Sequence, residues 1–412
     1  MRRVVVTGLG VVSALGHEPD ALFARLMAGQ SGIHLVSADG PAGQHFGLAA
    51  PVLFDPEQHF APGQKTDSLD RVSQFSLAAA GAALRDSAIP VNTDNAGRFG
   101  VSLGTGMGAN KSLEDAYIQL LLRDPNRMKP LTILTVMNNA SAAHIAMQHG
   151  LSGPNLTYSC ACASSAMAVG EAWRQIRHGY ADAMVAGGAE AMLTFGGFKT
   201  WEAMRVLAIA DRNDPSASCR PFSKNRSGLV LGEGAAMVVL EEREAALRRG
   251  ARIYAELVGY GSSNDPAHIT KPTVDGQARA MRLALADAGM NADGVDYVNA
   301  HGTATALNDV TETRAIKQVF GGCAYRLPVS STKSMLGHLL GGAGAMEFVI
   351  AVLAICHRAI PPTAHLDVPD PECDLDYVPG VGRHDQDVRC VMSNSFAFGG
   401  TNAVLIARQA DT

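Results

Sequence analysis

The sequence contains few aromatic residues, little charge and no excess of basic residues. Phe, Trp and Tyr together make up 6% of its 412 residues, and Asp, Glu, Lys and Arg make up 18%. The 34 basic residues are outnumbered by 39 acidic ones, which gives a formal net charge of -5. A chain without a global positive field is a poor candidate for binding nucleic acid or an anionic lipid surface.

A membrane-spanning helix and an export signal are also not expected. A bilayer-spanning helix needs roughly eighteen apolar residues, and the longest candidate, Phe348 to Ile355, is preceded by Glu347. The segment Met1 to Val12 has the charge and apolar run of a short signal peptide, but its β-branched start before Gly8-Leu9-Gly10 favours a first buried strand. The seven cysteines are odd in number and scattered, so we expect a reduced, cytoplasmic protein.

Short β-branched runs alternate with Ala-rich helical stretches, which is typical of an α/β protein whose sheets are covered by helices. Several helical stretches, such as Ser164 to Arg177, are uncharged all round the helix in their first part. This pattern predicts helices that are buried between layers. The run Ile253 to Val258 followed by Gly259-Tyr260-Gly261 is similar to the N-terminal strand and its glycines. We therefore predict two related halves, residues 1–250 and 251–412.

Cys162 is the first candidate for chemistry. Small residues from Ser159 to Ser165 lead from a strand-like run straight into a helix, with Cys162 at the turn. At such a turn the helix dipole and free backbone N–H groups favour a thiolate over a thiol, as in a nucleophile. The alternative is a small buried cysteine that packs like alanine, which is our interpretation of Cys160. The Cys-x-Cys spacing also allows a metal or disulfide site, but further pairs at zinc spacing are missing.

Two histidines stand in segments of low charge. His301 follows the strand-like run Val295 to Val298 and has Gly and Thr residues beside it, but taken alone a structural or surface histidine is equally expected. Lys333 precedes His338 by five residues, which indicates that the cation and the imidazole share a recess. The alternative there is a surface lysine and a histidine that caps a helix.

A last candidate segment, Asn394 to Asn402, carries Phe396 and Phe398 on alternate positions and a Gly399-Gly400 turn. Such a loop can move, or it can lend N–H groups to an oxyanion.

In this order and spacing, these segments closely resemble those of the β-ketoacyl-acyl-carrier-protein synthases, the decarboxylating condensing enzymes of the thiolase superfamily. The resemblance runs from Arg3 to Asn402, and within the family the chain looks most like the second, elongating type and the ketosynthases of dissociated polyketide systems. It implies a five-layered αβαβα thiolase fold built from two duplicated halves. It also implies a partner, acyl carrier protein, and either a homodimer or a heterodimer with a related ketosynthase-like subunit.

The implied reaction is acyl transfer followed by decarboxylative Claisen condensation, in fatty-acid or in type II polyketide or polyene elongation. By the resemblance, Cys162 takes the acyl chain, its N–H and that of Phe398 form the oxyanion hole, and His301 and His338 stabilise the enolate of malonyl carrier protein. No metal or free cofactor is implied, because phosphopantetheine enters on the carrier. The resemblance further implies that Lys333 and Glu347 lie beside the histidines and that Thr303 and Thr305 bind the phosphopantetheine arm. It also places Met107 at the acyl channel across the dimer interface, and Phe396 and Gly399 on a gating loop.

Two alternatives to this function stay open. One is a non-elongating subunit that shapes the pocket of a paired ketosynthase, although the intact Cys and two His argue against it. The other is a cysteine hydrolase. The chain also departs from the family where Ala397 replaces the usual Gly and where Asp67 replaces positive charge expected to receive the carrier, while Arg212 matches a second basic contact. These departures favour a specialised pathway slightly over primary fatty-acid synthesis.

Overall fold

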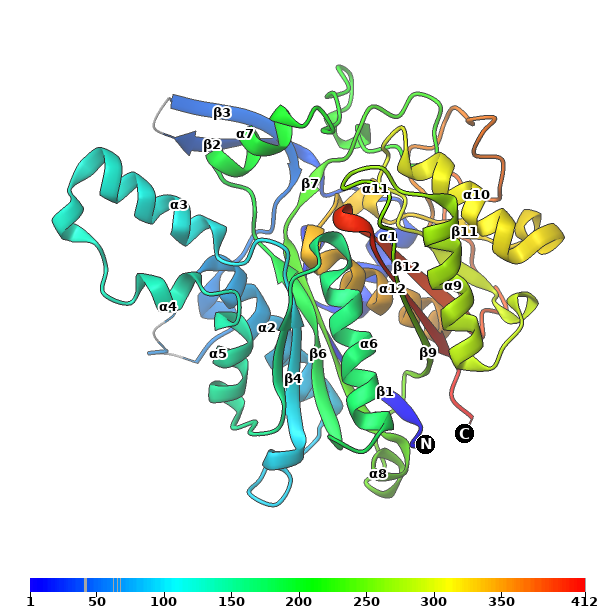
Figure 1. Ribbon diagram of the computed structural model, residues 1–412, viewed down its shortest axis with the longest axis horizontal. Helices are drawn as coiled ribbons and strands as arrows, with labels where there is room; N and C mark the ends of the chain where they lie inside the picture. Colours follow the sequence, from blue (N-terminus) through cyan, green and yellow to red (C-terminus); the bar gives the residue numbers. More distant parts are fainter. Residues whose placement is uncertain (41–42, 62, 65, 67, 412) are drawn as a thin grey trace.

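The computed structural model describes residues 1–40, 43–61, 63, 64, 66 and 68–411, and within these ranges ten strands form two five-stranded sets (Figure 1). Each set has three parallel strands followed by two antiparallel ones. The first set runs, in spatial order, β5 (Asn155–Tyr158), β4 (Phe99–Gly104), β6 (Ala183–Glu190), β8 (Gly234–Glu242) and β1 (Val4–Val12). The second runs β11 (Val329–Ser330), β10 (Tyr297–Asn299), β12 (Cys390–Phe396), β13 (Thr401–Arg408) and β9 (Ala255–Asn264).

The two sets share one connectivity. Numbered by chain order within each set, the spatial order of the strands is 3-2-4-5-1 in both. Strands β1 and β9, the first of each set, pair antiparallel and join the sets edge to edge. The connection between the sets passes through the short helix α8 (Arg243–Arg248).

Helices cover and separate the two sheets in five layers. Helix α2 (Arg71–Ser87) packs on the outer face of the first set, and α9 (Val274–Ala288) with α10 (Asn308–Phe320) covers the outer face of the second. Helices α6 (Ser164–Arg177) and α12 (Ala343–His357) contact strands of both sets and form the middle layer. The α/β class and the αβαβα thiolase-like layering expected from the sequence are confirmed.

The central helix α12 is apolar on every side except at Glu347. Its residues from Ala343 to Ile355 are all buried, as expected for a helix that lies between two sheets. Contrary to the sequence expectation, the segment Leu340–His357 is long and apolar enough to cross a membrane, because small residues before Glu347 extend the apolar run. Since 89% of that segment is buried inside the protein, its apolar character is explained by the core of this fold.

The repeated Gly-x-Gly has the same physical reason in both halves. A Cβ on Gly8 or Gly10 would lie 2.2 or 2.0 Å from carbonyl oxygens of α2. A Cβ on Gly259 or Gly261 would lie 2.4 or 2.1 Å from carbonyl oxygens of α9. Both first strands therefore need glycine where a covering helix approaches the strand backbone.

A smaller sheet lies beside the first set, at the upper left of Figure 1. It pairs β2 (His34–Gly40) with β3 (Gly43–Ala50) and β3 with β7 (Leu231–Gly232), and α7 (Phe195–Ala203) packs against it. The remaining helices are α1 (Pro19–Met27), α3 (Asn110–Ile118), α4 (Thr132–Val136), α5 (Ala140–His149) and α11 (Lys333–Leu336).

A buried carboxylate ties the first and last strands together. Glu256 on β9 accepts hydrogen bonds from Arg3 at 2.5 and 2.6 Å and from Arg408 at 3.1 and 3.2 Å. Its side chain is only 4% exposed. Burial acts to raise the pKa of Glu256, but the hydrogen bonds from the two arginines outweigh it and leave this pKa below its usual range.

We predict that Glu256→Gln lowers the free energy of unfolding by about 1–3 kcal/mol at neutral pH, because two arginines lose a desolvated anionic partner. A carboxylate whose pKa is lowered by folding stabilises above its unfolded pKa, and this contribution is lost as the pH falls through the folded value. The gap to the wild type should therefore close in acid. Denaturant unfolding of the wild type and the variant, at neutral pH and in acid, measures this gap in the free energy of unfolding.

Asp182→Asn is the matched control. The ion pairs of Asp182 with Arg2 and Arg98 are 42–44% exposed, so the loss in the free energy of unfolding should stay below about 1 kcal/mol. Equal losses in the two variants would contradict the account.

Candidate active site

Cys162 lies in a strained turn directly before α6. The turn Ala161–Ala163 connects β5 to the helix, as the sequence predicted. Ala161 has a φ of +48°, which is unfavourable for a residue with a Cβ. The Ser164 hydroxyl stabilises the turn, since it accepts from the Cys160 N–H at 2.8 Å and donates to the Ala161 carbonyl at 2.7 Å. The Cys162 side chain is buried at the N-terminal end of α6.

The structure brings Cys162, His301 and His338 together, although they are far apart in the sequence. His338 Nε2 lies 3.0 Å from Cys162 Sγ. The rings of His301 and His338 are 5.4 Å apart between centroids and nearly perpendicular, at 82°. One ligating atom from each of the three residues lies within 4.8 Å of the others. All three side chains are buried, so they form one enclosed reactive cluster.

Both imidazoles have a hydrogen-bond partner at Nδ1. The Leu340 N–H donates to His338 Nδ1 at 3.2 Å, and Lys333 Nζ lies 3.4 Å from His301 Nδ1. A neutral ring that accepts at Nδ1 carries its proton on Nε2. Burial, followed by the Lys333 charge, holds the pKa of both histidines well below the usual range. The site therefore presents two neutral Nε2–H donors beside one sulfur.

Lys333 and Glu347 form a buried ion pair behind His301. Lys333 Nζ donates to Glu347 Oε1 and, at 2.6 Å, to the His301 carbonyl oxygen. Both side chains are almost fully buried. Burial raises the pKa of Glu347 to about 7, against the opposing effect of Lys333. The sequence predicted that Lys333 shares a recess with His338, and the structure places its direct contact on the other histidine.

The resting sulfur is a thiol, contrary to the sequence expectation of a thiolate. Burial raises the pKa of Cys162 to about 12. The Lys333 charge and a hydrogen bond from the Phe398 backbone N–H lower this pKa, but they do not offset desolvation, and Glu190 and Glu347 add to the rise. The turn at the helix N-terminus is present as predicted, but a helix end cannot compensate for the removal of water from the sulfur.

A thiol and two imidazoles are also groups that ligate transition metals. Here a lysine ammonium lies against one of the imidazoles, 3.4 Å from His301 Nδ1. A fixed positive charge this close opposes a metal cation at the cluster. The arrangement fits a nucleophile with two hydrogen-bond donors better than it fits a metal site.

Two buried carboxylates that sequence reasoning did not single out hold the His301 segment. Glu312 accepts from the backbone N–H groups of His301 at 2.9 Å and Gly302 at 2.8 Å. Asp309 accepts from the N–H of Thr303 at 3.1 Å. Both lie in α10 and are fully buried. Their signal in the sequence is a pair of acids three residues apart, shortly after a Gly- and Thr-rich loop.

A third carboxylate, Glu190 at the end of β6, connects two glycine-rich turns. It accepts from the N–H of Gly106 at 2.7 Å, of Gly341 at 3.1 Å, and of Met107 at 3.2 Å. Burial raises the pKa of Glu190 to about 7, although these hydrogen bonds oppose the rise. Glu190 thus links the segment that carries Met107 to the segment that follows His338.

The remaining loop residues lie around the cluster. The hydroxyls of Thr303 and Thr305 are 2.9 Å apart, and Arg226 donates to the Thr305 carbonyl. Phe396 is buried with its ring 6.0 Å from that of His301. Gly399 has a φ of +83°, and its N–H donates to the Ile269 carbonyl at 2.7 Å.

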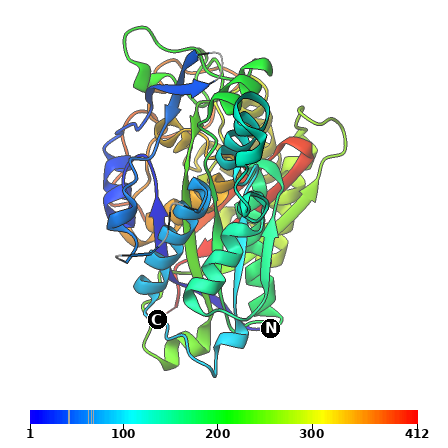
Figure 2. The same ribbon diagram turned by 90° about the vertical axis from the view of Figure 1, so that its left-hand side faces the viewer.

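Met107 lies in the turn between β4 and α3, and α3 is on the side of the molecule turned to the viewer in Figure 2. Its side chain is 54% exposed and lines an apolar groove of about 480 Å³. Leu113, Tyr117 and Leu121 on the same groove are also exposed. Arg212, the expected basic carrier contact, is exposed, whereas Asp67, which replaces expected positive charge, lies outside the described residues.

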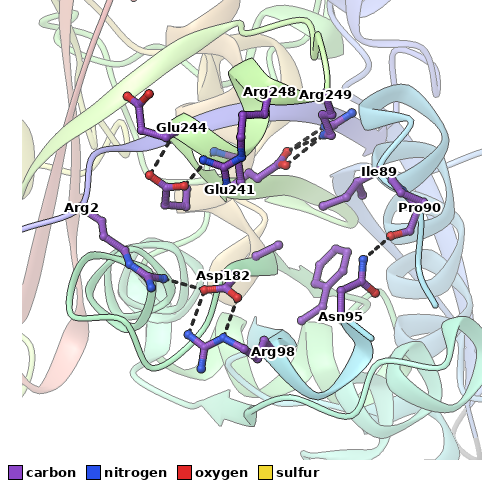
Figure 3. Close-up of a pocket in the computed structure, with 14 residues that line it drawn as sticks. Arg2, Ile89, Pro90, Asn95, Arg98, Asp182, Glu241, Glu244, Arg248 and Arg249 are labelled. Carbon is purple, nitrogen blue, oxygen red and sulfur yellow. Dashed lines mark hydrogen bonds and ion pairs between the residues drawn. The ribbon is translucent and has the colours of Figure 1, made fainter. Parts of the chain in front are cut away.

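A separate cavity of about 510 Å³ lies at the opposite ends of β4 and β6 (Figure 3). Asp182 pairs there with Arg2 at 2.6 Å and with Arg98 at 2.5 Å, and Glu241 pairs with Arg249 at 2.7 Å. Neither cysteine nor histidine is among the described residues that line it. The described residues that line this cavity form ion pairs with one another and offer no cysteine or histidine for covalent chemistry.

We predict that NMR of ¹⁵N-labelled histidine shows both active-site rings as neutral Nε2–H tautomers from pH 8 down to about pH 6. The reason is that burial and the Lys333 charge disfavour the imidazolium form. The variants His301→Ala and His338→Asn assign the two signals. Protonation of either ring with a midpoint near 6.5, the ordinary value for histidine, would contradict this interpretation.

Comparison with known proteins identifies relatives along the whole chain. The family profile "Beta-ketoacyl synthase, N-terminal domain" matches residues 1–246, and "Beta-ketoacyl synthase, C-terminal domain" matches residues 254–367. The 3-oxoacyl-[acyl-carrier-protein] synthase 2 of Synechocystis sp. is 44% identical over 98% of this chain and 97% of its own. Nodulation protein E of Rhizobium meliloti is 44% identical over 99% of both chains. The solved structure of the ishigamide ketosynthase/chain length factor is 37% identical, with a TM-score of 0.91 and 100% of both chains covered.

Proposed function

The chain belongs to the β-ketoacyl synthase family, and from this premise we propose that it condenses an acyl chain with malonyl carrier protein. The observation that carries the proposal is the buried cluster of one thiol and two neutral imidazoles. The reaction is an acyl transfer followed by a decarboxylative Claisen condensation. It serves elongation in fatty-acid synthesis or in a type II polyketide or polyene pathway.

In the first step Cys162 Sγ attacks the carbonyl carbon of an acyl thioester on the carrier. A C–S bond forms to Cys162, and the negative charge that develops on the carbonyl oxygen is stabilised by the N–H groups of Cys162 and Phe398. His338 Nε2–H faces the sulfur and stabilises negative charge there as the proton leaves. The C–S bond to the carrier then breaks, and the carrier thiolate takes up the proton that the Cys162 thiol gives up.

In the second step His301 and His338 donate Nε2–H bonds to the thioester oxygen of malonyl carrier protein. The bond to the carboxylate breaks, carbon dioxide leaves, and its electron pair forms an enolate that the two donors stabilise. The enolate carbon attacks the acyl-Cys162 carbonyl, so that a C–C bond forms and the C–S bond to Cys162 breaks. The Cys162 thiolate is released and regains a proton from solvent.

Other residues hold this arrangement in place. Lys333 and Glu347 keep His301 oriented and neutral, and Thr303 and Thr305 bind the phosphopantetheine arm of the carrier. Phe396 and Gly399 belong to the loop that admits the acyl chain. The reaction uses no cofactor besides that arm, and the enzyme works in the cytoplasm, where acyl carrier protein is its partner. We also infer that the chain is built from the duplicated halves 1–250 and 251–412, which share one strand order.

The exposed apolar face around Met107 supports a dimer in which this residue reaches the acyl channel of the partner subunit. A groove lined by Met107, Leu113, Tyr117 and Leu121 is too apolar to remain in water without a partner. The second subunit is another copy of this chain or a related ketosynthase-like protein. A similar solved protein is described as a ketosynthase with a chain length factor, which illustrates the second arrangement.

The alternative function is a non-elongating subunit that shapes the pocket of an active ketosynthase. Such a subunit does not need a cysteine nucleophile with His338 Nε2 at 3.0 Å from its sulfur. It also does not need the buried Lys333–Glu347 pair behind His301. The geometry therefore favours the enzyme.

We predict that mass spectrometry detects an acyl adduct on Cys162 after incubation with acyl carrier protein. Cys162→Ala should carry none, and the matched control Cys160→Ala should be acylated like the wild type. His301→Ala should still be acylated, but its carbon dioxide release from malonyl carrier protein should fall by about 10²–10³-fold, because one enolate donor is lost.

Two results would contradict this proposal. A folded protein without an adduct, tested with a candidate partner subunit present and absent, would support the non-elongating role. Thioester hydrolysis without carbon dioxide release would support a cysteine hydrolase.

A further inference from the structure

Trp201 contacts the loop that faces the nucleophile. It lies near the C-terminal end of α7, and its ring stacks on that of Phe398, with centroids 6.2 Å apart and planes 24° apart. This is the offset geometry that aromatic pairs prefer. The family-like motifs in the sequence did not include Trp201. It is one of two tryptophans in the chain, and the other, Trp173, is buried in α6.

The Phe398 loop has little rigidity of its own. Gly399 and Gly400 both have positive φ, at +83° and +82°, and glycine backbones are held only by their contacts. The Gly399 N–H donates to the carbonyl of the exposed Ile269, and the Gly400 carbonyl accepts from the N–H of the buried Asp265. The segment Phe398–Gly400 contacts the Cys162 turn Ala161–Ala163, and the Phe398 N–H lowers the pKa of the Cys162 thiol. Among the described residues, no hydrogen bond from this N–H to a backbone carbonyl of another segment fixes it. Its position therefore depends on where the Phe398 side chain rests.

Trp201 offers a firm support for that side chain. It packs against an apolar cluster that includes Phe198 and Leu340, and Leu340 is the residue whose N–H donates to His338. Helix α7 is anchored at its start by Thr194, whose hydroxyl accepts from the Gly197 N–H and donates to Glu114 at 2.6 Å. One apolar cluster thus supports both the Phe398 ring and the segment that orients His338.

We infer that Trp201 is a positioning residue that holds the Phe398 N–H against the Cys162 sulfur through the aromatic stack. This inference rests on the proposed function for its meaning in catalysis, because an N–H held there serves the oxyanion of acyl transfer. Trp201 itself contacts neither sulfur nor imidazole in the described contacts. Its effect passes through Phe398.

The kinetic experiment compares Trp201→Leu, which keeps apolar contact with the cluster, with Trp201→Phe, which also keeps an aromatic face. For Trp201→Leu we expect a fall of about 2- to 12-fold in the rate constant of Cys162 acylation, the equivalent of one aromatic pair, with KM for the acyl carrier unchanged. Trp201→Phe should restore most of the rate. A rise in KM alone, or equal rates in Leu and Phe variants, would overturn the inference.

A second measurement does not depend on the proposed function. The Phe398 N–H lowers the pKa of the Cys162 thiol, so alkylation of Cys162 by iodoacetamide at fixed pH should be slower in Trp201→Leu than in the wild type and in Trp201→Phe. Unchanged or faster alkylation would overturn the inference. Slower alkylation without any acylation by carrier-bound substrate would retain the inference and refute the proposed function instead.

Fluorescence keeps the inference testable even where Trp201→Leu does not fold. In the variant Trp173→Phe, Trp201 is the sole tryptophan, and Trp173 is remote because its indole N–H donates to the Leu257 carbonyl on β9. Adding Phe398→Leu should change the emission of Trp201, since the stacked ring is lost. An unchanged emission spectrum would show that the two rings are not in contact, and it would overturn the inference.

Discussion

The site depends on the hydrogen bonds received by the inner nitrogens of two buried imidazoles. With Nδ1 of His338 facing the Leu340 N–H and Nδ1 of His301 facing Lys333, each ring has its proton on the outer nitrogen. Burial and the lysine charge keep the rings neutral. A neutral donor can stabilise an enolate without protonating it fully, and it leaves the neighbouring sulfur free to act as the nucleophile. Without these two contacts, the rings would present no defined donor to the substrate.

The shared strand order of the two sets explains why such distant residues meet. Cys162 follows β5, His301 follows β10, and Phe398 follows β12, so each stands after the end of a parallel strand of its own set. The middle helices α6 and α12 contact both sets, and their N-terminal ends place the Cys162 turn and the segment after His338 between the sheets. Both of these segments carry backbone strain: Ala161 and Leu340 have left-handed backbones, which the surrounding structure holds in place.

Much of this arrangement is predictable from the sequence, because the motifs are local. The turn at Cys162, the histidines after short strands and the glycines facing covering helices all follow from neighbouring residues. Other features were missed for physical reasons. Glu190, Asp309 and Glu312 act by accepting main-chain N–H groups, and no local pattern marks which donors they will meet. The thiolate expectation was wrong because desolvation depends on how segments distant in the sequence pack around the sulfur. The Trp201 stack joins residues almost two hundred positions apart.

The most direct test of the central claim measures carbon dioxide and product together. Enzyme acylated on Cys162 is mixed with malonyl carrier protein labelled in its free carboxyl group, and labelled carbon dioxide and β-ketoacyl carrier are counted in the same sample. If the thiol and both imidazoles form one condensing site, the two products appear in a one-to-one ratio. Carbon dioxide released without a matching β-ketoacyl product would contradict the account.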